Sequence, residues 1–177
     1  LDFYKTKKPL VVIDAAARVG GILANSNFPY QFLTENMMIQ SNLIDGALKT
    51  GIEKFIFLGS SCIYPKIAPQ PIRESYLLTD SLEPTNEWYA IAKITGVKSC
   101  QAIRNQFDKD YVSLMPTNLY GYFDNFDLET SHVIPAMIRK FHEAKINSNS
   151  VVKLWGSGTP MREFLFTYDL SKCLEKI

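Results

Sequence analysis

The sequence lacks an excess of charge of either sign. Nineteen lysine and arginine residues are balanced by eighteen aspartate and glutamate residues, which leaves a formal net charge of +1 over 177 residues. Proteins that bind nucleic acid neutralise phosphates with clustered basic side chains, and anionic membrane surfaces also select basic segments. The composition therefore argues against nucleic acid and against a membrane as partners.

Long apolar runs and a paired set of cysteines are also absent. No run approaches the roughly 18 to 20 apolar residues that a membrane-spanning helix needs. The three cysteines, Cys62, Cys100 and Cys173, cannot all pair, lack the spacing of a metal site and follow no charged and then apolar leader. We therefore expect a soluble, cytoplasmic protein without a bound metal.

The chain does contain enough apolar material for a sizeable core, since 46% of its residues are hydrophobic and 12% are aromatic. No repeat, low-complexity tract or linker divides it. It begins at Leu1 without an initiator methionine, and residues Asp169 to Ile177 have the pattern of an unfinished amphipathic helix. We expect one continuous fragment of a larger fold.

Apolar runs and helical periodicities alternate along the chain. Short apolar runs predict strands, and apolar residues three or four apart predict helices. The predicted strands are Leu10–Ile13, Phe55–Leu58, Tyr111–Met115 and Val151–Leu154, and the predicted helices are Pro29–Thr50, Tyr89–Phe107 and His132–Ala144. Uniformly apolar strands that alternate with helices predict a doubly wound α/β fold, with a parallel sheet covered on both faces.

In such a sheet, ligands bind beyond the carboxyl ends of the strands, so the loops after Ile13, Leu58 and Met115 are expected to line one site. A tyrosine and a lysine four residues apart on a helix share a face, and the ammonium group favours the phenolate and lowers the tyrosine pKa. Such a pair suits proton transfer.

Three tyrosine and lysine pairs have this spacing, so the spacing alone is weak evidence. Tyr4/Lys8 precedes the first strand and Tyr168/Lys172 lies near the end of the chain. Only Tyr89/Lys93 begins a helix after a strand that ends in hydroxyl side chains, at Ser60 and Ser61. The pair Tyr89/Lys93 is therefore the candidate catalytic pair.

Six segments resemble the extended short-chain dehydrogenase/reductase family, also described as NAD-dependent epimerases/dehydratases. They are Gly59–Pro65, Glu83–Lys93, Ala15–Gly21, Met115–Gly121, Ser131–Pro135 and Trp155–Phe164, and they span nearly the whole chain. Within this family, the segments most closely resemble those of the members that convert GDP-4-keto-6-deoxy-D-mannose to GDP-L-fucose. It implies a Rossmann-like fold and an NADPH-dependent enzyme that epimerises C3 and C5 of the sugar and then reduces C4.

The resemblance implies catalytic roles for five residues. Cys62 and His132 would remove and return the protons beside the ketone, and Tyr89 would donate a proton to the C4 oxygen. Lys93 would tune the tyrosine and hold the nicotinamide ribose, while Ser60 would hydrogen-bond the carbonyl group.

The resemblance also implies binding residues. NADP(H) would be held by Leu58, Gly59, Ser60, Ser61, Lys93, Pro116, Thr117, Asn118, Leu119 and His132, and the nucleotide-sugar substrate by Lys140, Trp155 and Arg162. Asn36 would organise the catalytic groups. The complete enzyme would be a homodimer.

The same resemblance divides the chain at residue 130. Residues 1–130 would form the C-terminal portion of the NADP-binding Rossmann domain, and residues 131–177 a partial substrate-binding region with return strand segments. The N-terminal Gly-rich βαβ unit that holds a dinucleotide pyrophosphate is not among these residues, so NADP rather than NAD rests on the resemblance alone. We expect weak cofactor affinity and little or no turnover by this polypeptide alone.

Simpler interpretations remain for several of these residues. Ser60 and Ser61 could form only a turn, Cys62 could be a small buried hydrophobic residue, and Trp155 could belong to the core. For the chain as a whole, the alternatives are another nucleotide-sugar epimerase or dehydratase of the superfamily, and a non-catalytic α/β binding module. A dehydratase normally has an acidic pair before its catalytic tyrosine, and Asn86-Glu87-Trp88 does not provide one.

Overall fold

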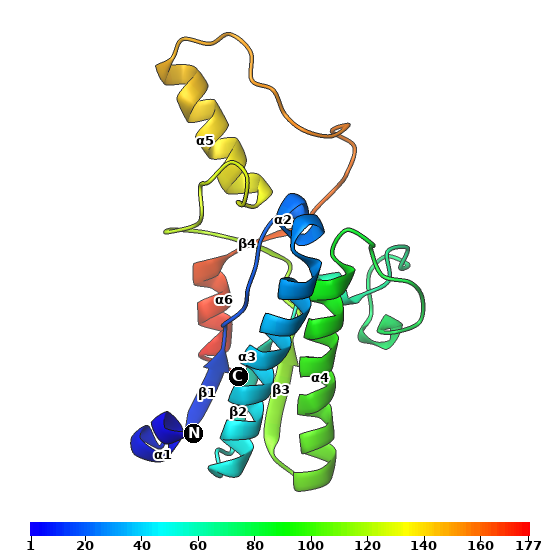
Figure 1. Cartoon of the computed structure of the whole chain (residues 1–177), viewed down its shortest axis with the longest axis vertical. Helices are drawn as coiled ribbons and strands as arrows, with labels where there is room; N and C mark the ends of the chain where they lie inside the picture. Colours follow the sequence, from blue (N-terminus) through cyan, green and yellow to red (C-terminus); the bar gives the residue numbers. More distant parts are fainter. The chain divides into compact units, whose positions relative to one another are not determined.

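The computed structural model describes all residues from 1 to 177, and they form two compact units. Unit 1 consists of Leu1–Val19 and Asn25–Pro116, and unit 2 of Gly20–Ala24 and Thr117–Ile177. Figure 1 gives the order of the elements along the chain. The boundary at Pro116 lies upstream of the predicted division at residue 130, and the assignment of residues 117–130 to the nucleotide-binding domain stays a prediction.

Unit 1 is built on a parallel sheet. Its strands are β1 (Val11–Asp14), β2 (Lys54–Leu58) and β3 (Asp110–Leu114), in the order β1-β2-β3. The register pairs Asp14 with Phe57, and Phe57 with Ser113. The three strands predicted from apolar runs in this region are confirmed to within one residue at each end, as is their parallel direction.

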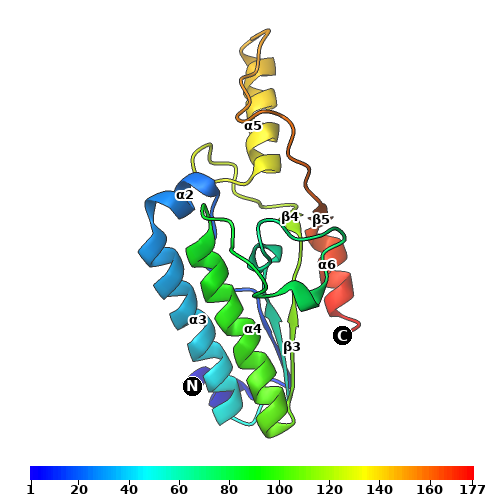
Figure 2. The same cartoon turned by 90° about the vertical axis from the view of Figure 1, so that its right-hand side faces the viewer.

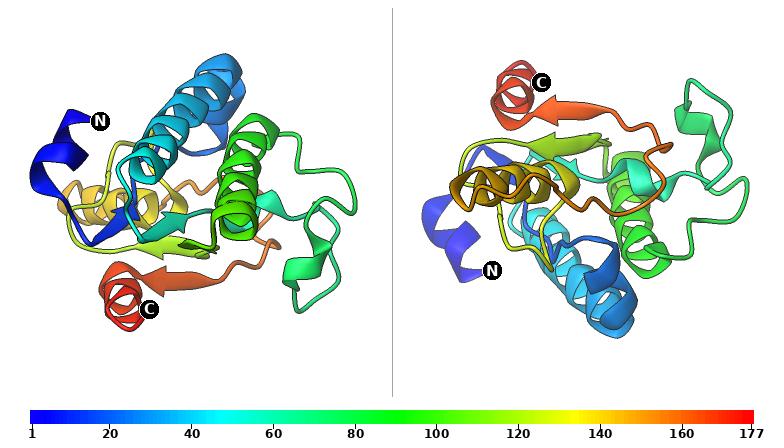
Figure 3. Two further views of the ribbon diagram at one scale, coloured as in Figure 1. Left: turned by 90° about the horizontal axis from the view of Figure 1, so that it is seen from below. Right: turned by 90° about the horizontal axis from the view of Figure 1, so that it is seen from above.

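Two long helices, α3 (Pro29–Lys49) and α4 (Glu87–Phe107), lie on the same face of this sheet (Figures 2 and 3). Both were predicted from periodicity. Helix α3 begins with proline, whose fixed backbone angle suits the first helical turn. It ends before Gly51, which adopts a φ of 76°. A short helix, α1 (Asp2–Lys7), precedes β1 and was not predicted.

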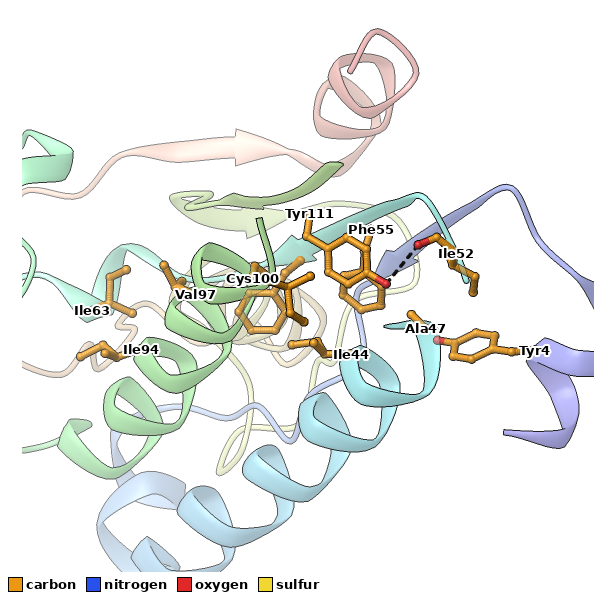
Figure 4. Packing of buried hydrophobic residues seen from close by; sticks show 12 residues of the cluster. Tyr4, Ile44, Ala47, Ile52, Phe55, Ile63, Ile94, Val97, Cys100 and Tyr111 are labelled. Atoms are coloured by element: carbon orange, nitrogen blue, oxygen red, sulfur yellow. Dashed lines mark hydrogen bonds between the residues drawn. The ribbon is translucent and has the colours of Figure 1, made fainter. Parts of the chain in front are cut away.

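The core of unit 1 lies between the sheet and these helices (Figure 4). Phe55 of β2 stacks on Tyr111 of β3 with ring centroids 5.4 Å apart, and the Tyr111 hydroxyl donates to the Ile52 carbonyl at 3.2 Å. Ile44 of α3 and Val97 of α4 complete the same cluster. Central strand β2 is buried on both sides, which is why its sequence is continuously apolar rather than alternating.

Helix α4 approaches the sheet closely because residue 96 is glycine. A Cβ atom there would lie 2.7 Å from Cε1 of the Phe57 ring, which is too close for carbon atoms. Helix α4 is also joined to α3 by Gln40, whose Nε2 donates to the Ala92 carbonyl at 2.5 Å and to Thr95 Oγ1 at 2.7 Å. These contacts set the position of α4 on the sheet.

Strand β1 is buried on one side and open on the other. Asp14 points into the unit and is buried, whereas Val11 and Ile13 are 45% and 47% exposed. Both long helices of unit 1 cover the buried side. The prediction that the apolar strands are covered on both faces therefore does not hold for β1 within this unit.

Unit 2 contains a small parallel sheet of β4 (Asn118–Tyr120) and β5 (Phe164–Phe166), helix α5 (Val133–Ile146) and helix α6 (Thr167–Leu174). Helix α2 (Ile22–Asn27) crosses the division between the units. Tyr120 and Phe166 pack across the sheet with ring centroids 5.5 Å apart. The predicted helix His132–Ala144 corresponds to α5, with His132 as its N-cap residue.

The predicted strand Val151–Leu154 is wrong. These residues have no regular structure, and Val151 and Leu154 are 79% and 46% exposed. The strand that pairs with β4 lies farther along the chain, at Phe164–Phe166. A short apolar run becomes a strand only when a neighbouring strand accepts its backbone hydrogen bonds, and no strand lies beside residues 151–154 in this fold.

None of the helices is both long enough and apolar enough to cross a bilayer.

Candidate functional site

Backbone hydrogen bonds hold the segment that follows β2 to the segment that follows β3. The Gly59 N–H donates to the Leu114 carbonyl at 2.8 Å, and the Ser61 N–H donates to the Pro116 carbonyl at 3.3 Å. A Cβ atom at Gly59 would lie 3.2 Å from the Leu114 oxygen, so a larger residue would push the two strand ends apart. These hydrogen bonds therefore join the ends of β2 and β3 at the carboxyl edge of the sheet.

Ser60 caps the short 3₁₀ turn Ser61–Ile63 that follows. Its hydroxyl oxygen accepts a hydrogen bond from the Cys62 N–H at 3.2 Å. This is a turn, as the simpler interpretation held, but it also places the Ser60 hydroxyl and the Cys62 thiol at the sheet edge. Cys62 is only partly buried, so it is not a core residue, whereas Cys100 is buried and Cys173 is exposed.

Helix α4 brings Tyr89 and Lys93 to the same edge. Lys93 is only 3% exposed. Its Nζ donates to the Leu58 carbonyl at 2.7 Å and lies 4.7 Å from the centroid of the Phe57 ring and 5.9 Å from that of Tyr89. As the four-residue spacing predicted, both side chains lie on one face of the helix.

The effect on the tyrosine differs from the prediction. Burial raises the Tyr89 pKa above its ordinary value of 10.0, the nearby Cys62 raises it further, and hydrogen bonding with Ser60 lowers it. The predicted net lowering of the Tyr89 pKa is wrong for this structure, because desolvation of the phenol is the largest contribution and raises the pKa. The phenol is kept neutral, and a neutral phenol has a proton to donate.

Lys93 itself is in an unusual environment. Burial lowers its pKa from the ordinary 10.5, and the charge of Asp14 raises it. Asp14 ends strand β1, is 2% exposed and accepts a hydrogen bond from the Ala16 N–H at 3.0 Å. Asp14 was not predicted as a site residue, although an acidic residue directly after an apolar strand run was the available signal.

The loop after β1 is held against α3 by Asn36. The Asn36 Oδ1 accepts from the Arg18 N–H at 2.8 Å, and its Nδ2 donates to the Arg18 carbonyl at 3.1 Å. The Arg18 guanidinium pairs with Glu35 at 3.1 Å and lies 5.4 Å from the centroid of Phe32. Phe32 in turn packs edge-on against Tyr89, with ring centroids 6.4 Å apart. Asn36 thus organises this loop. Arg18, a charged residue of the same loop, was not predicted as part of the site.

The other predicted residues belong to unit 2, apart from Pro116 at the end of unit 1. Thr117 Oγ1 and Asn118 Nδ2 both donate to the Glu163 carbonyl, at 2.8 and 3.0 Å, and Leu119 follows within β4. These contacts join the start of β4 to the segment before β5. His132 is exposed at the start of α5.

The three predicted substrate residues are exposed or partly exposed. The Lys140 ammonium lies 4.9 Å from the centroid of the Trp155 ring, and Trp155 is 70% exposed. The interpretation of Trp155 as a core aromatic is therefore wrong. The Arg162 guanidinium donates to the Met161 carbonyl at 2.7 Å. A solvent-facing indole next to a cation is suited to stacking on a flat, anionic ligand.

Within unit 1 the structure thus brings Ser60, Cys62, Tyr89 and Lys93 together. A neutral phenol lies beside a hydroxyl group, a thiol and a buried ammonium group. Such a set can donate a proton to an oxygen that gains negative charge and can stabilise the phenolate that remains. The predicted residues His132, Lys140, Trp155 and Arg162 belong to unit 2.

The chain is similar in sequence and in structure to known proteins. The chain is 60% identical over 170 residues to GDP-L-fucose synthase 1 of Arabidopsis thaliana, covering 96% of this chain and 53% of that protein. It is 58% identical over 172 residues to GDP-L-fucose synthase of Sinorhizobium fredii, covering 97% and 55% respectively. The structure of a GDP-L-fucose synthetase from Naegleria fowleri bound to NADP matches with a TM-score of 0.84 and 31% identity, over 97% of this chain and 56% of that one.

The chain spans about half the length of the curated relatives that it matches. The predicted Rossmann-like α/β class is confirmed by these matches and by the parallel sheet of unit 1. The family model described as "NAD dependent epimerase/dehydratase family" matches residues 1–177, and the chain belongs to this family.

Proposed function

We propose that the protein containing this chain converts GDP-4-keto-6-deoxy-D-mannose to GDP-L-fucose, by epimerisation at C3 and C5 followed by NADPH-dependent reduction at C4. The observation that carries this proposal is that Ser60, Cys62, Tyr89 and Lys93 are grouped at the carboxyl end of β2. Two relatives near 60% identity that are named GDP-L-fucose synthase support the choice of substrate.

The side chains at this edge fit a nicotinamide cofactor. Hydroxyl and ammonium donors suit the ribose and carboxamide of a nicotinamide nucleotide, and the segment from Leu58 to Ser61 contains no acidic side chain that would repel its phosphates. We assign NADP(H) binding to Leu58–Ser61, Lys93, Pro116–Leu119 and His132, and a neighbour bound to NADP supports this choice. When bound, NADPH supplies the two electrons for reduction at C4.

In the reduction, Tyr89 donates its proton to the C4 oxygen while that oxygen gains negative charge. Burial keeps the phenol protonated before this step. The Ser60 hydroxyl hydrogen-bonds the same oxygen, and the Lys93 ammonium stabilises the phenolate that remains. The buried position of Lys93 strengthens this stabilisation, because water does not screen the charge.

In the epimerisation, the C4 ketone acidifies the protons at C3 and C5, since the enolate carries its charge on oxygen. Inversion requires one group to remove each proton and another to return it from the opposite face of the ring. We assign these two roles to Cys62 and His132. The partial exposure of Cys62 supports its role, because a base must reach its substrate.

The GDP moiety is assigned to Lys140, Trp155 and Arg162. The exposed Trp155 indole offers a stacking surface for a base or a sugar, and the two cations complement a diphosphate. The homodimer stays a prediction.

The test combines NADPH oxidation with solvent deuterium incorporation at C3 and C5 of the substrate. In the protein containing this chain, Tyr89→Phe should reduce the rate of NADPH oxidation by about 10²- to 10⁴-fold and leave deuterium incorporation in place. Cys62→Ser should mainly slow deuterium incorporation. Equal loss of both activities in either variant would contradict the assigned roles.

A further inference from the structure

Asp14 carries a carboxylate oxygen for which the proposed mechanism has no use. The residue is 2% exposed, and its Oδ1 accepts from the Ala16 N–H at 3.0 Å. Its Oδ2 is inaccessible to solvent and has no hydrogen-bond partner. A buried ionised carboxylate without a compensating positive charge is costly, so this oxygen requires a physical explanation.

The strand register places Asp14 on the same face of the sheet as Lys93. Asp14 is paired with Phe57 across β1 and β2, and residues paired in this way extend from the same face of a sheet. The Phe57 ring lies against α4 at Gly96, and the Lys93 ammonium lies 4.7 Å from the centroid of that ring. The two oppositely charged side chains are therefore both neighbours of Phe57, and both are buried, at 2% and 3% exposed.

We propose that Asp14 is a positioning residue that acts through Lys93. Its carboxylate is the counter-charge that keeps the buried Lys93 in its ammonium form, hydrogen-bonded to the Leu58 carbonyl. The part of this inference that concerns catalysis rests on the proposed function, whereas the charge coupling between the two side chains does not.

Burial and charge act in opposite directions on both groups. Burial lowers the Lys93 pKa, and Asp14 raises it. Burial raises the Asp14 pKa, whereas the Ala16 N–H and Lys93 lower it. Without the carboxylate, burial would favour the neutral amine.

The other titratable groups that respond to Asp14 are neutral at physiological pH. They are Tyr4 on α1 and Cys100 on α4, and the charge of Asp14 contributes to raising the pKa of each. The buried polar residues of α3, Asn36 and Gln40, do not titrate. Lys93 is thus the positive charge that Asp14 faces.

For catalysis, a neutral Lys93 could not stabilise the Tyr89 phenolate. Asp14→Asn is therefore expected to lower kcat for NADPH oxidation, to move the alkaline limb of the pH profile to lower pH, and to leave KM for the nucleotide sugar unchanged. A purely structural role would instead lower kcat at every pH without moving that limb.

The direct test follows Lys93 by ¹³Cε NMR in the 177-residue chain, with its signal assigned by its loss in Lys93→Arg. In Asp14→Asn the titration midpoint of Lys93 should move to lower pH. Glu53→Gln is the matched control, since Glu53 is paired with Lys109, and it should leave the midpoint in place. An unchanged midpoint in folded Asp14→Asn would overturn the proposal.

If Asp14→Asn does not fold, Lys93→Met tests the coupling from the other side. Coupling between two sites is reciprocal, so the Asp14 carboxyl, followed by ¹³Cγ NMR, should titrate at higher pH in Lys93→Met than in the wild type. Identical Asp14 titration would refute the proposal. Shifted titrations in a complete protein that does not oxidise NADPH would refute the proposed function and leave the Asp14–Lys93 coupling established.

Discussion

The two groups of predicted functional residues differ most in their access to water. Lys93, beside the carboxyl end of β2 in unit 1, is 3% exposed, whereas Trp155 in unit 2 is 70% exposed. Burial changes the protonation behaviour of Tyr89 and Lys93. The side chains of unit 2 instead present an indole ring and cations to solvent.

This difference is consistent with the two roles proposed for these groups, proton transfer and ligand recognition. Proton transfer requires groups whose pKa values are controlled by their surroundings, and desolvation provides that control. Recognition of a large polar ligand requires surfaces that are open before the ligand arrives. Packing should therefore matter for stability around β2 and α4, and much less around Trp155.

The largest expected effect comes from Phe57, which is fully buried beneath α4. Phe57→Ala should lower the free energy of unfolding by about 3–5 kcal/mol, because it leaves a cavity in the core. Trp155→Ala should change it by less than about 1 kcal/mol, since an exposed side chain leaves no cavity. Urea unfolding of both variants checks this, and comparable losses would contradict the difference between the two regions.

The second effect is a loss of stability in alkaline solution. Burial raises the Cys100 pKa from 9.0 to about 11, so the unfolded chain loses this proton first. The contribution of the protonated Cys100 thiol to the free energy of unfolding is fully present below pH 9 and is lost as the pH rises through 11. At about 1.4 kcal/mol per pH unit, the decline amounts to at most about 3 kcal/mol.

Thermal or urea unfolding between pH 8 and 11 measures this decline. Cys100→Ala should flatten the decline between pH 9 and 11, while variant Cys173→Ala, at an exposed position, should keep the slope of the wild type. Tyr111 has a pKa raised to about 12 by burial and adds a further decline between pH 10 and 12. A slope unaffected by Cys100→Ala would count against the buried thiol as its source.

The third effect tests the close approach of α4 to the sheet. Gly96→Ala should lower the free energy of unfolding by about 1–3 kcal/mol, because the added methyl group meets the Phe57 ring. Gly46→Ala on α3 is the matched control. Its added Cβ would lie 3.2 Å from the Tyr4 ring, and a gain in helix propensity of about 1 kcal/mol offsets that contact. Chemical denaturation of the two variants should rank Gly96→Ala as the more harmful.

The smallest effect concerns the exposed pair in unit 2. Lys140→Met removes the cation beside Trp155 and should lower stability by about 0.5 kcal/mol or less, because water competes for the exposed ammonium. The Trp155 fluorescence should change even so, measured in a Trp88→Phe background with Lys98→Met as control. A loss comparable to that of Gly96→Ala would mean that the pair is part of a packed core.

The long elements of unit 1 were predictable because each carries a strong local pattern. Helices α3 and α4 are 21 residues each, which is long enough for helical periodicity to be unambiguous. Strands β4 and β5 have three residues each and could not be recognised in the same way. The false strand at 151–154 had an apolar run and no neighbouring strand, and that second condition is not local.

The candidate site divides in a similar manner. The position of Tyr89 and Lys93 on one helical face follows from their spacing, and Ser60 and Cys62 follow from the end of an apolar strand. Asp14 and Arg18 were missed because their partners are distant in the sequence. The sign of the Tyr89 pKa shift was predicted wrongly, because it depends on how much water the fold removes.

The sequence by itself determined the parallel α/β class, the main helices and strands of unit 1, and the resemblance that identifies its catalytic candidates. These properties follow from periodicity and from motifs that are contiguous in the chain. Only the tertiary structure decided that Lys93 is buried against Phe57 and that Asp14 is its counter-charge. Burial and electrostatic coupling are sums over neighbours from separate elements, and packing of those elements brings such neighbours together.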